Sequence, residues 1–204
     1  KFVADGFGVN RKDVMYNDFI ILGPASDPAG IKGMTSATDA FKKIADAKAP
    51  FVSRGDNSGT HTKEKEIWAA AGIEPQGEWY IEAGQGMGAV LTMANEQNAY
   101  TLSDRGTYLA RTLEGTDLQV LVEGDPILFN PYGVIAVNPE KYGTVNYDLA
   151  MKFITWLTSV PTQQMILDFK HPPGQSLFTP DSEEWKAVAP QKLILATTTS
   201  TADS

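Results

Sequence analysis

The stretch PFVSRGDNSGTHTKEKEIWAAAG, residues 50–72, reads as a strand, a turn and a helix in immediate succession. Residues 50–53 have the apolar character of a strand, and the chain then turns through Gly55. Residues 58–71 are rich in helix formers, with apolar Ile67 and Trp68 inside the segment and Gly72 where a helix-ending glycine is expected. A strand that passes through a short turn into a helix is the repeating unit of α/β proteins.

The same alternation continues on both sides of this unit. An apolar run stopped by Gly-Pro predicts a strand over residues 17–24, and a helix is predicted over residues 38–47. Met87, Val90, Leu91 and Ala94 have helical spacing, so a further helix opens after the Gly-Gln-Gly of residues 84–86. Further strands are predicted at residues 120–122, 133–137 and 192–196, and further helices at residues 148–159 and 162–169. Such alternation predicts a mainly parallel sheet covered on both faces.

Composition limits the class of protein. The chain has 204 residues, of which 42% are hydrophobic and 21% charged, which is enough for one large domain or two small lobes. The net charge is −8 and the 17 basic residues are scattered, which argues against a nucleic-acid partner. An anionic ligand would therefore need local donors. With two histidines, no cysteine and no clustered carboxylates, we expect no metal site.

The first candidate site is the loop between the strand and the helix of the opening stretch. A helix that begins near Ser58 offers unpaired N–H groups and the positive end of its dipole, which suit an anion. Ser58 and Thr60 add hydroxyl donors, Gly59 permits close approach, and Arg54 adds a charged fork that Asp56 can hold in place. The alternative is that Ser58 is only a helix cap and that the arginine is a surface residue.

The second candidate site is the run of five hydroxyl residues at 197–201, which follows the predicted strand at 192–196. Consecutive threonines and serines are poor core material, but they can surround an anion with O–H and N–H donors at the end of a strand. The alternative is a serine or threonine cap at the start of another helix.

These motifs carry a resemblance to a known family. The segments KFVADGFGVNRKDVMYNDFIILGP (1–24), SRGDNSGTH (53–61), EAGQGMG (82–88) and LILATTTSTADS (193–204) together resemble the tungstate-binding proteins of ABC transporters, within the type II periplasmic binding fold. The resemblance covers nearly the whole chain. It implies two sets of ligand-binding residues, Thr198, Thr199 and Ser200 on one lobe and Ser53, Arg54, Ser58, Gly59 and Thr60 on the other, with Asp56 behind the arginine.

The order of the segments departs from the family. There the TTTS strand comes first and the DGFG segment follows several dozen residues later, whereas here the TTTS strand comes last. The stretch that connects the two in the family, with a second loop of oxyanion donors, is not in this sequence. We therefore expect part of the site to be contributed by residues outside it.

The resemblance also implies an architecture and a function. It implies a two-lobed α/β protein with mixed, mainly parallel sheets flanked by helices. Residues 1–22 and 131–204 would form lobe I, which includes the TTTS strand and turn at 192–201, and residues 23–130 would form lobe II. The ligand cleft would lie between the lobes. The expected function is that of the extracytoplasmic or periplasmic solute-binding subunit of an ABC importer, which captures tungstate. We expect a monomer with a membrane permease as its partner, no cofactor and no enzymatic activity, and no export signal is seen in the sequence.

Two alternatives remain open at this point. Asp56, Ser58 and His61 could suggest a hydrolase, but the nucleophile and base would share one helix start and the pattern G-x-S-x-G is missing. Within the binding class, molybdate or phosphate could replace tungstate, because Arg-x-Asp-x-Ser-Gly-Thr also resembles the loop of phosphate-binding proteins. Phosphate near neutral pH carries a proton and needs an acceptor, whereas tungstate needs donors only.

Overall fold

The computed structural model describes residues 1–112, 114–171 and 174–188. Its helices are α1 (Ala37–Asp46), α2 (Gly59–Ala71), α3 (Met87–Glu96), α4 (Arg105–Thr112), α5 (Tyr147–Thr158), α6 (Val160–Asp168) and α7 (Glu183–Val188), with a 3₁₀ turn η1 (Pro126–Leu128). Its strands are β1 (Gly8–Gly23), β2 (Phe51–Ser53), β3 (Tyr80–Glu82), β4 (Thr101–Asp104), β5 (Gln119–Val122), β6 (Phe129–Val137), β7 (Lys170–His171), β8 (Gln175–Ser176) and β9 (Thr179–Pro180).

Most of the predicted elements are present at the predicted positions. Helices α1, α2, α3, α5 and α6 and strands β2, β5 and β6 match their predicted ranges closely, although β6 starts earlier, at Phe129. The predicted strand at 17–24 is the buried half of β1, which starts at Gly8. Its first half contains polar and charged residues that are mostly exposed or half-buried, so hydrophobicity alone did not reveal it. The predicted strand at 192–196 lies outside the described residues.

The prediction of a mainly parallel sheet is wrong for the described residues. All the pairings of β1 are antiparallel, with β4, β5, β6 and β9. Parallel pairing joins β2 to β3, and a parallel bridge from Phe51 to Tyr100 joins β2 to the residue before β4. The strands β2, β3 and β4 follow the α/β alternation and run parallel, as that pattern requires. The mixed sheet arises because β1 enters beside β4 in the opposite direction.

Two apolar cores lie on opposite faces of this sheet. Phe19 and Ile21 of β1 pack with α1 and α2, whereas Ile20 and Leu22 pack with α3. This division follows from the alternation of side chains along a strand. The sheet is therefore covered by helices on both faces, as predicted, and the carboxyl ends of β2 and β4 lie at one edge.

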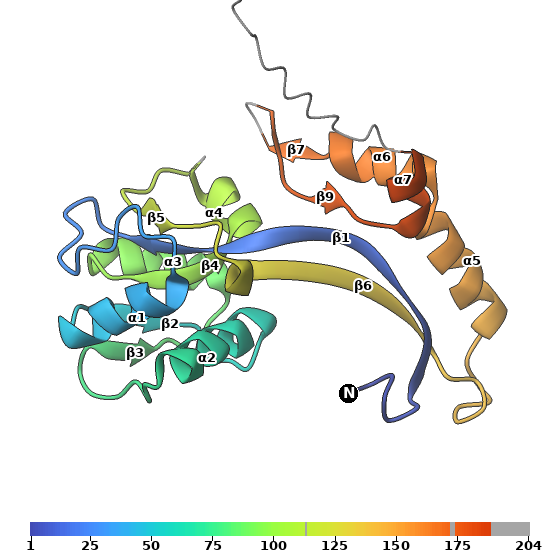
Figure 1. Cartoon of the computed structure of the whole chain (residues 1–204), viewed down its shortest axis with the longest axis horizontal. Coiled ribbons are helices and arrows are strands. Elements are labelled where there is room, and N and C mark those ends of the chain that lie inside the picture. The colour runs from blue at the N-terminus through green and yellow to red at the C-terminus, as the bar shows by residue number, and fades with distance from the viewer. Residues whose placement is uncertain (113, 172–173, 189–204) are drawn as a thin grey trace, which may run out of the picture.

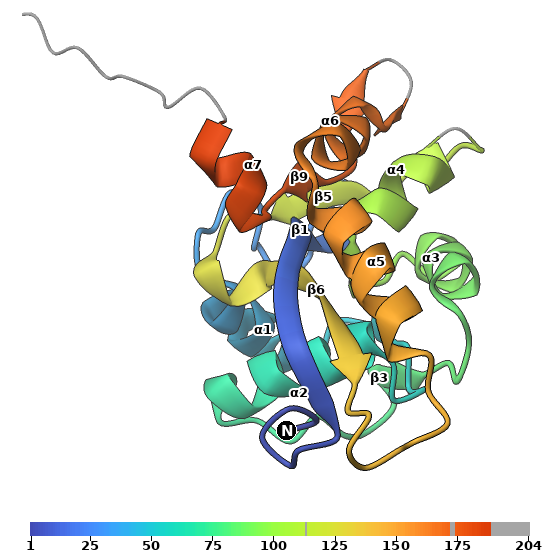
Figure 2. The ribbon, with the colours of Figure 1, turned by 90° about the vertical axis from the view of Figure 1, so that its right-hand side faces the viewer.

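The long strands β1 and β6 connect two groups of elements (Figure 1). One group contains α1 to α4 and β2 to β5, and the other contains α5 to α7 with the short strands β7 to β9. Figure 2 shows that α5, in the second group, runs beside β6 and is in contact with this strand. Leu149, Phe153 and Trp156 of α5 are exposed, so this helix packs on one side only within the described residues. No helix in the described part of the chain is both long and apolar enough to span a membrane.

Candidate functional site

Helix α2 starts at the carboxyl end of β2, as the sequence predicted, and Ser58 is its cap. Ser58 has an extended backbone, and its Oγ accepts a hydrogen bond from the backbone N–H of His61 at 3.3 Å. At the other end, Gly72 adopts the left-handed conformation, with φ of 71°, that glycine tolerates best. The first N–H groups of α2 have no partner within the helix, so this start presents the positive end of a helix dipole.

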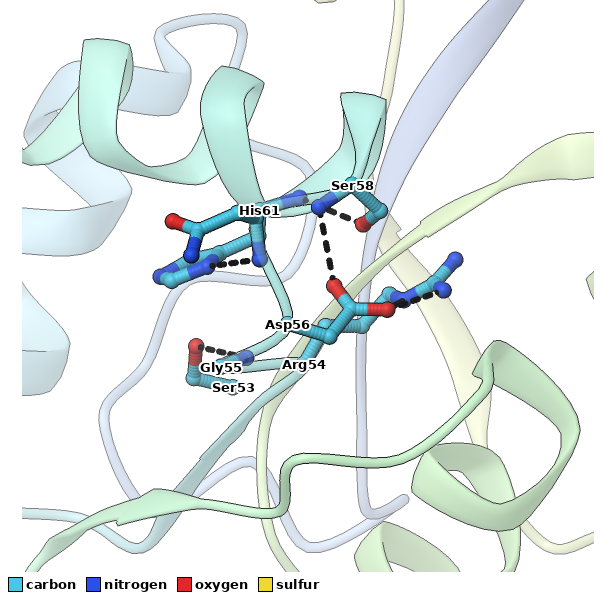
Figure 3. Close-up of polar contacts among 7 residues, drawn as sticks. Ser53, Arg54, Gly55, Asp56, Ser58 and His61 are labelled. Atoms are coloured by element: carbon cyan, nitrogen blue, oxygen red, sulfur yellow. Dashed lines mark hydrogen bonds and ion pairs between the residues drawn. The ribbon is translucent and has the colours of Figure 1, made fainter.

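Arg54, Asp56 and Ser58 form one cluster in front of this helix start (Figure 3). Asp56 Oδ2 accepts from Nε of Arg54 at 3.1 Å and also from its Nη2, while Asp56 Oδ1 accepts from the backbone N–H of Ser58 at 3.0 Å. The pKa of Asp56 is lowered to about 2, first by the hydroxyl of Ser58 and further by the Ser58 N–H and Arg54. Asp56 is thus an ionised acceptor that is already engaged by the loop itself.

Ser53 is placed differently from the expectation for a ligand donor. It is fully buried, and its hydroxyl donates to Glu64 Oε2 at 2.8 Å, while its Oγ accepts the backbone N–H of Gly55 at 3.3 Å. The side chain of Ser53 therefore links the turn at Gly55 to the buried Glu64. Because its hydroxyl hydrogen is donated to Glu64, the side chain is poorly placed to donate to a ligand as well. Ligand binding by the backbone of Ser53 stays a prediction.

Glu64 is a buried carboxylate beneath the loop that sequence reasoning missed. Besides Ser53, its Oε1 accepts from the Tyr80 hydroxyl at 2.7 Å and from Trp68 Nε1 at 3.2 Å. Burial raises the pKa of Glu64, and these three hydrogen bonds act in the opposite direction. The Ser53 and Glu64 side chains are eleven residues apart in the sequence, and no periodicity indicates that they meet.

His61 also contacts the loop through its side chain. Its Nδ1 accepts the backbone N–H of Asn57 at 3.0 Å, and the residue is buried. Because Ser58 Oγ faces the backbone of His61 and the ring faces Asn57, these contacts are those of a helix cap. They do not form the hydrogen bond between a nucleophile and its base that the hydrolase alternative requires.

The structure brings together the predicted residues of the loop. Arg54, Ser58 and Gly59 lie at the surface of the helix start, whereas the side chain of Thr60 is largely buried. Thr198, Thr199 and Ser200 lie outside the described residues, so the opposing donors remain a prediction.

Two further helix starts share this edge of the sheet. Helix α3 follows β3 and begins at Met87, after an N-cap glycine, Gly86, that has no side chain to cap it, and α4 follows β4 directly. Arg105, the first residue of α4, is held by Asp18 of β1 and by Glu123, which raise its pKa. The Gly-Gln-Gly before α3 was a sequence signal for such a start, but the partners of Arg105 are 87 and 18 residues away along the chain.

A hollow of about 830 Å³ borders the loop on the side of Gly55, Asn57 and His61. Lys65, Tyr80 and Glu82 also line it, so it contains charges of both signs. Among the described residues, no group of three or more acidic or histidine side chains is arranged to hold a metal ion. The donors at the start of α2 are N–H groups, hydroxyls and a guanidinium, which are suited to an anion.

Comparisons with known proteins show which family the chain resembles. Residues 1–161 match the family described as PBP superfamily domain. The tungstate-binding protein TupA of Peptoclostridium acidaminophilum is 49% identical over 185 residues, which cover 89% of this chain and 64% of that protein. The chain spans between 54% and 64% of the length of the curated relatives it matches.

Two solved structures are similar in both fold and sequence. The tungstate-binding protein TupA from Desulfovibrio alaskensis G20 superimposes with a TM-score of 0.76 at 50% identity, covering 89% of this chain and 74% of that one. A structure described as the tungstate ABC transporter from Geobacter sulfurreducens gives a TM-score of 0.72 at 59% identity, covering 82% of this chain and 71% of that one.

Proposed function

Because the chain belongs to the PBP superfamily, we propose that it is the solute-binding subunit of an ABC importer and that its ligand is tungstate. Three comparisons support this function: a curated relative and two solved structures, at 49% to 59% sequence identity, carry tungstate in their names. The proposal includes an extracytoplasmic or periplasmic location, a membrane permease as partner, a monomeric state and no enzymatic activity.

The observation that carries the proposal is the start of helix α2. The N–H groups of the first turn of α2, the Ser58 cap and the Arg54 guanidinium lie together at the edge of the sheet. Arg54 keeps donors to spare, because a guanidinium has five N–H groups and two of its nitrogens point to Asp56. The tetrahedral oxyanion would accept from these donors without needing an acceptor from the protein.

We further propose that the ligand lies in a cleft between two lobes, formed by residues 23–130 and by residues 1–22 with 131–204. In that arrangement Thr198, Thr199 and Ser200 would supply donors from the second lobe. Binding would then favour a closed form, because only closure brings both sets of donors to one anion.

Phosphate is the weaker candidate because of Asp56. Near neutral pH phosphate carries a proton and needs an acceptor, but both carboxylate oxygens of Asp56 already accept hydrogen bonds from the loop. Molybdate has the same acceptor chemistry as tungstate and is the closer competitor.

The test is calorimetric titration of the purified chain with sodium tungstate, molybdate, sulfate and phosphate in the same buffer. We expect tungstate to bind most tightly and phosphate to bind weakly. Binding of none of the four anions would contradict the oxyanion function. Preference for phosphate would contradict the role assigned to Asp56.

A further inference from the structure

His61 takes part in two hydrogen bonds that tie helix α2 to the loop before it. Its backbone N–H donates to Ser58 Oγ at 3.3 Å, and its ring Nδ1 accepts from the backbone N–H of Asn57 at 3.0 Å. In a capping box, the third residue of the helix returns a hydrogen bond to the backbone at the cap. His61 is the third residue of α2, and it accepts from Asn57, the residue before the cap. The N–H of the cap residue itself, Ser58, is already accepted by Asp56.

The bond to Asn57 holds the strained residue of the loop. Asn57 adopts a left-handed backbone, with φ of 58°, which residues other than glycine adopt rarely. Its side chain is held as well, because Lys65 Nζ donates to Asn57 Oδ1 at 3.1 Å. Asn57 lies between Asp56 and Ser58, so its orientation determines how the arginine-bearing turn meets the helix start.

The geometry also defines the form of the ring. An Nδ1 that accepts an N–H carries no hydrogen, so the ring is neutral with its hydrogen on Nε2. Burial lowers the pKa of His61 and so favours this neutral form. The charged groups around the ring are Lys65 of α2, Glu82 at the end of β3, and Asp56 and Arg54 of the loop.

We propose that His61 is a positioning residue of the oxyanion site, which holds Asn57 through its unprotonated Nδ1 and so fixes the loop that presents Arg54 and Ser58. This inference rests on the proposed function, since it assigns a role within the same site. The ordinary alternative is a buried residue that stabilises α2 without influence on the ligand.

The experiment compares the parent chain with His61→Ala and His61→Asn. Asparagine can place its Oδ1 close to the position of the imidazole Nδ1, so it restores the acceptor without a titrating ring. Sodium tungstate is titrated calorimetrically at about pH 8, at a temperature where circular dichroism shows each variant folded. We expect His61→Ala to weaken binding about five- to tenfold, the loss of one hydrogen bond, and His61→Asn to stay within about twofold of the parent.

Nitrogen-15 NMR of the unliganded chain gives a readout that does not depend on binding. Substituting the chain's other histidine, His171→Asn, assigns the ring signals. We expect the Nε2–H form of His61, and an Asn57 amide signal that shifts when His61 is replaced by alanine.

Equal tungstate affinity of His61→Ala and the parent would overturn the inference, as would an Nδ1–H ring. If the parent binds none of the anions, the proposed function fails. The ring form and the Asn57 amide then decide whether His61 fixes the loop.

Discussion

Arg54→Ala is the substitution that tests the placement of the site most directly. Arg54 is the only charged donor in the loop, its side chain is 19% exposed, and it lies in front of the α2 start. Losing a charge-assisted contact in a desolvated cleft costs about 2 to 5 kcal/mol. Because Asp56 already offsets part of its charge, we expect the lower end, about 2 to 3 kcal/mol, or about 30- to 150-fold in tungstate affinity.

The assay is calorimetric titration with tungstate, combined with thermal unfolding of the same samples. The Arg54–Asp56 pair lies near the surface, so we expect little change in stability. Arg54→Lys should recover part of the affinity, because an ammonium group cannot reproduce the planar fork. If Arg54→Ala binds tungstate as tightly as the parent while its melting temperature falls, Arg54 is a structural partner of Asp56 and the site lies elsewhere.

Three further predictions follow from the same geometry. Ser58→Ala should lower the free energy of unfolding by about 1 kcal/mol, because it removes the helix cap, and urea unfolding measures this change. It should weaken tungstate binding less than Arg54→Ala does, and a larger loss of affinity in calorimetry would contradict this ranking. Burial raises the pKa of Glu64 above 4.5, so its contribution to stability is full below that pH and is lost as pH rises through its folded pKa. The unfolding free energy of the parent should therefore fall, relative to that of Glu64→Gln, as pH rises through the folded pKa. Parallel plots of unfolding free energy against pH for the two proteins would refute this prediction. Tungstate affinity should change less than about twofold between about pH 7 and 9, because the pKa of His61 is held below 6.5 and that of Asp56 at about 2. A steep change of affinity in this range would point to a different site.

The sequence alone determined the elements that depend on local patterns. The apolar spacing of α3 and the glycine after α2 are properties of neighbouring residues, so those helices could be predicted within a few positions. The strand-to-helix turn at residues 53–60 was predicted as an anion site for the same reason, because a Ser-Gly-Thr helix start is a local feature.

Short elements without an apolar period could not be predicted in this way. Strand β4 and helix α4 have polar sequences and owe their positions to packing against β1 and α3. The direction of pairing was also beyond the sequence, because strand alternation describes connections along the chain and does not reveal that β1 enters the sheet antiparallel to its neighbours.

The support of the candidate site was decided by the tertiary structure. Ser53 was expected to face the ligand, but the fold places Glu64 next to it, and the Ser53 hydroxyl donates its hydrogen bond to that carboxylate. His61 invited an enzymatic interpretation, but the fold turns its ring toward Asn57. A hydroxyl or an imidazole can act in several ways, and its role is set by the partner that the fold brings within hydrogen-bonding distance. The sequence could therefore name the residues of the loop, and only the folded chain could determine which of them are exposed to an anion and which hold the others in place.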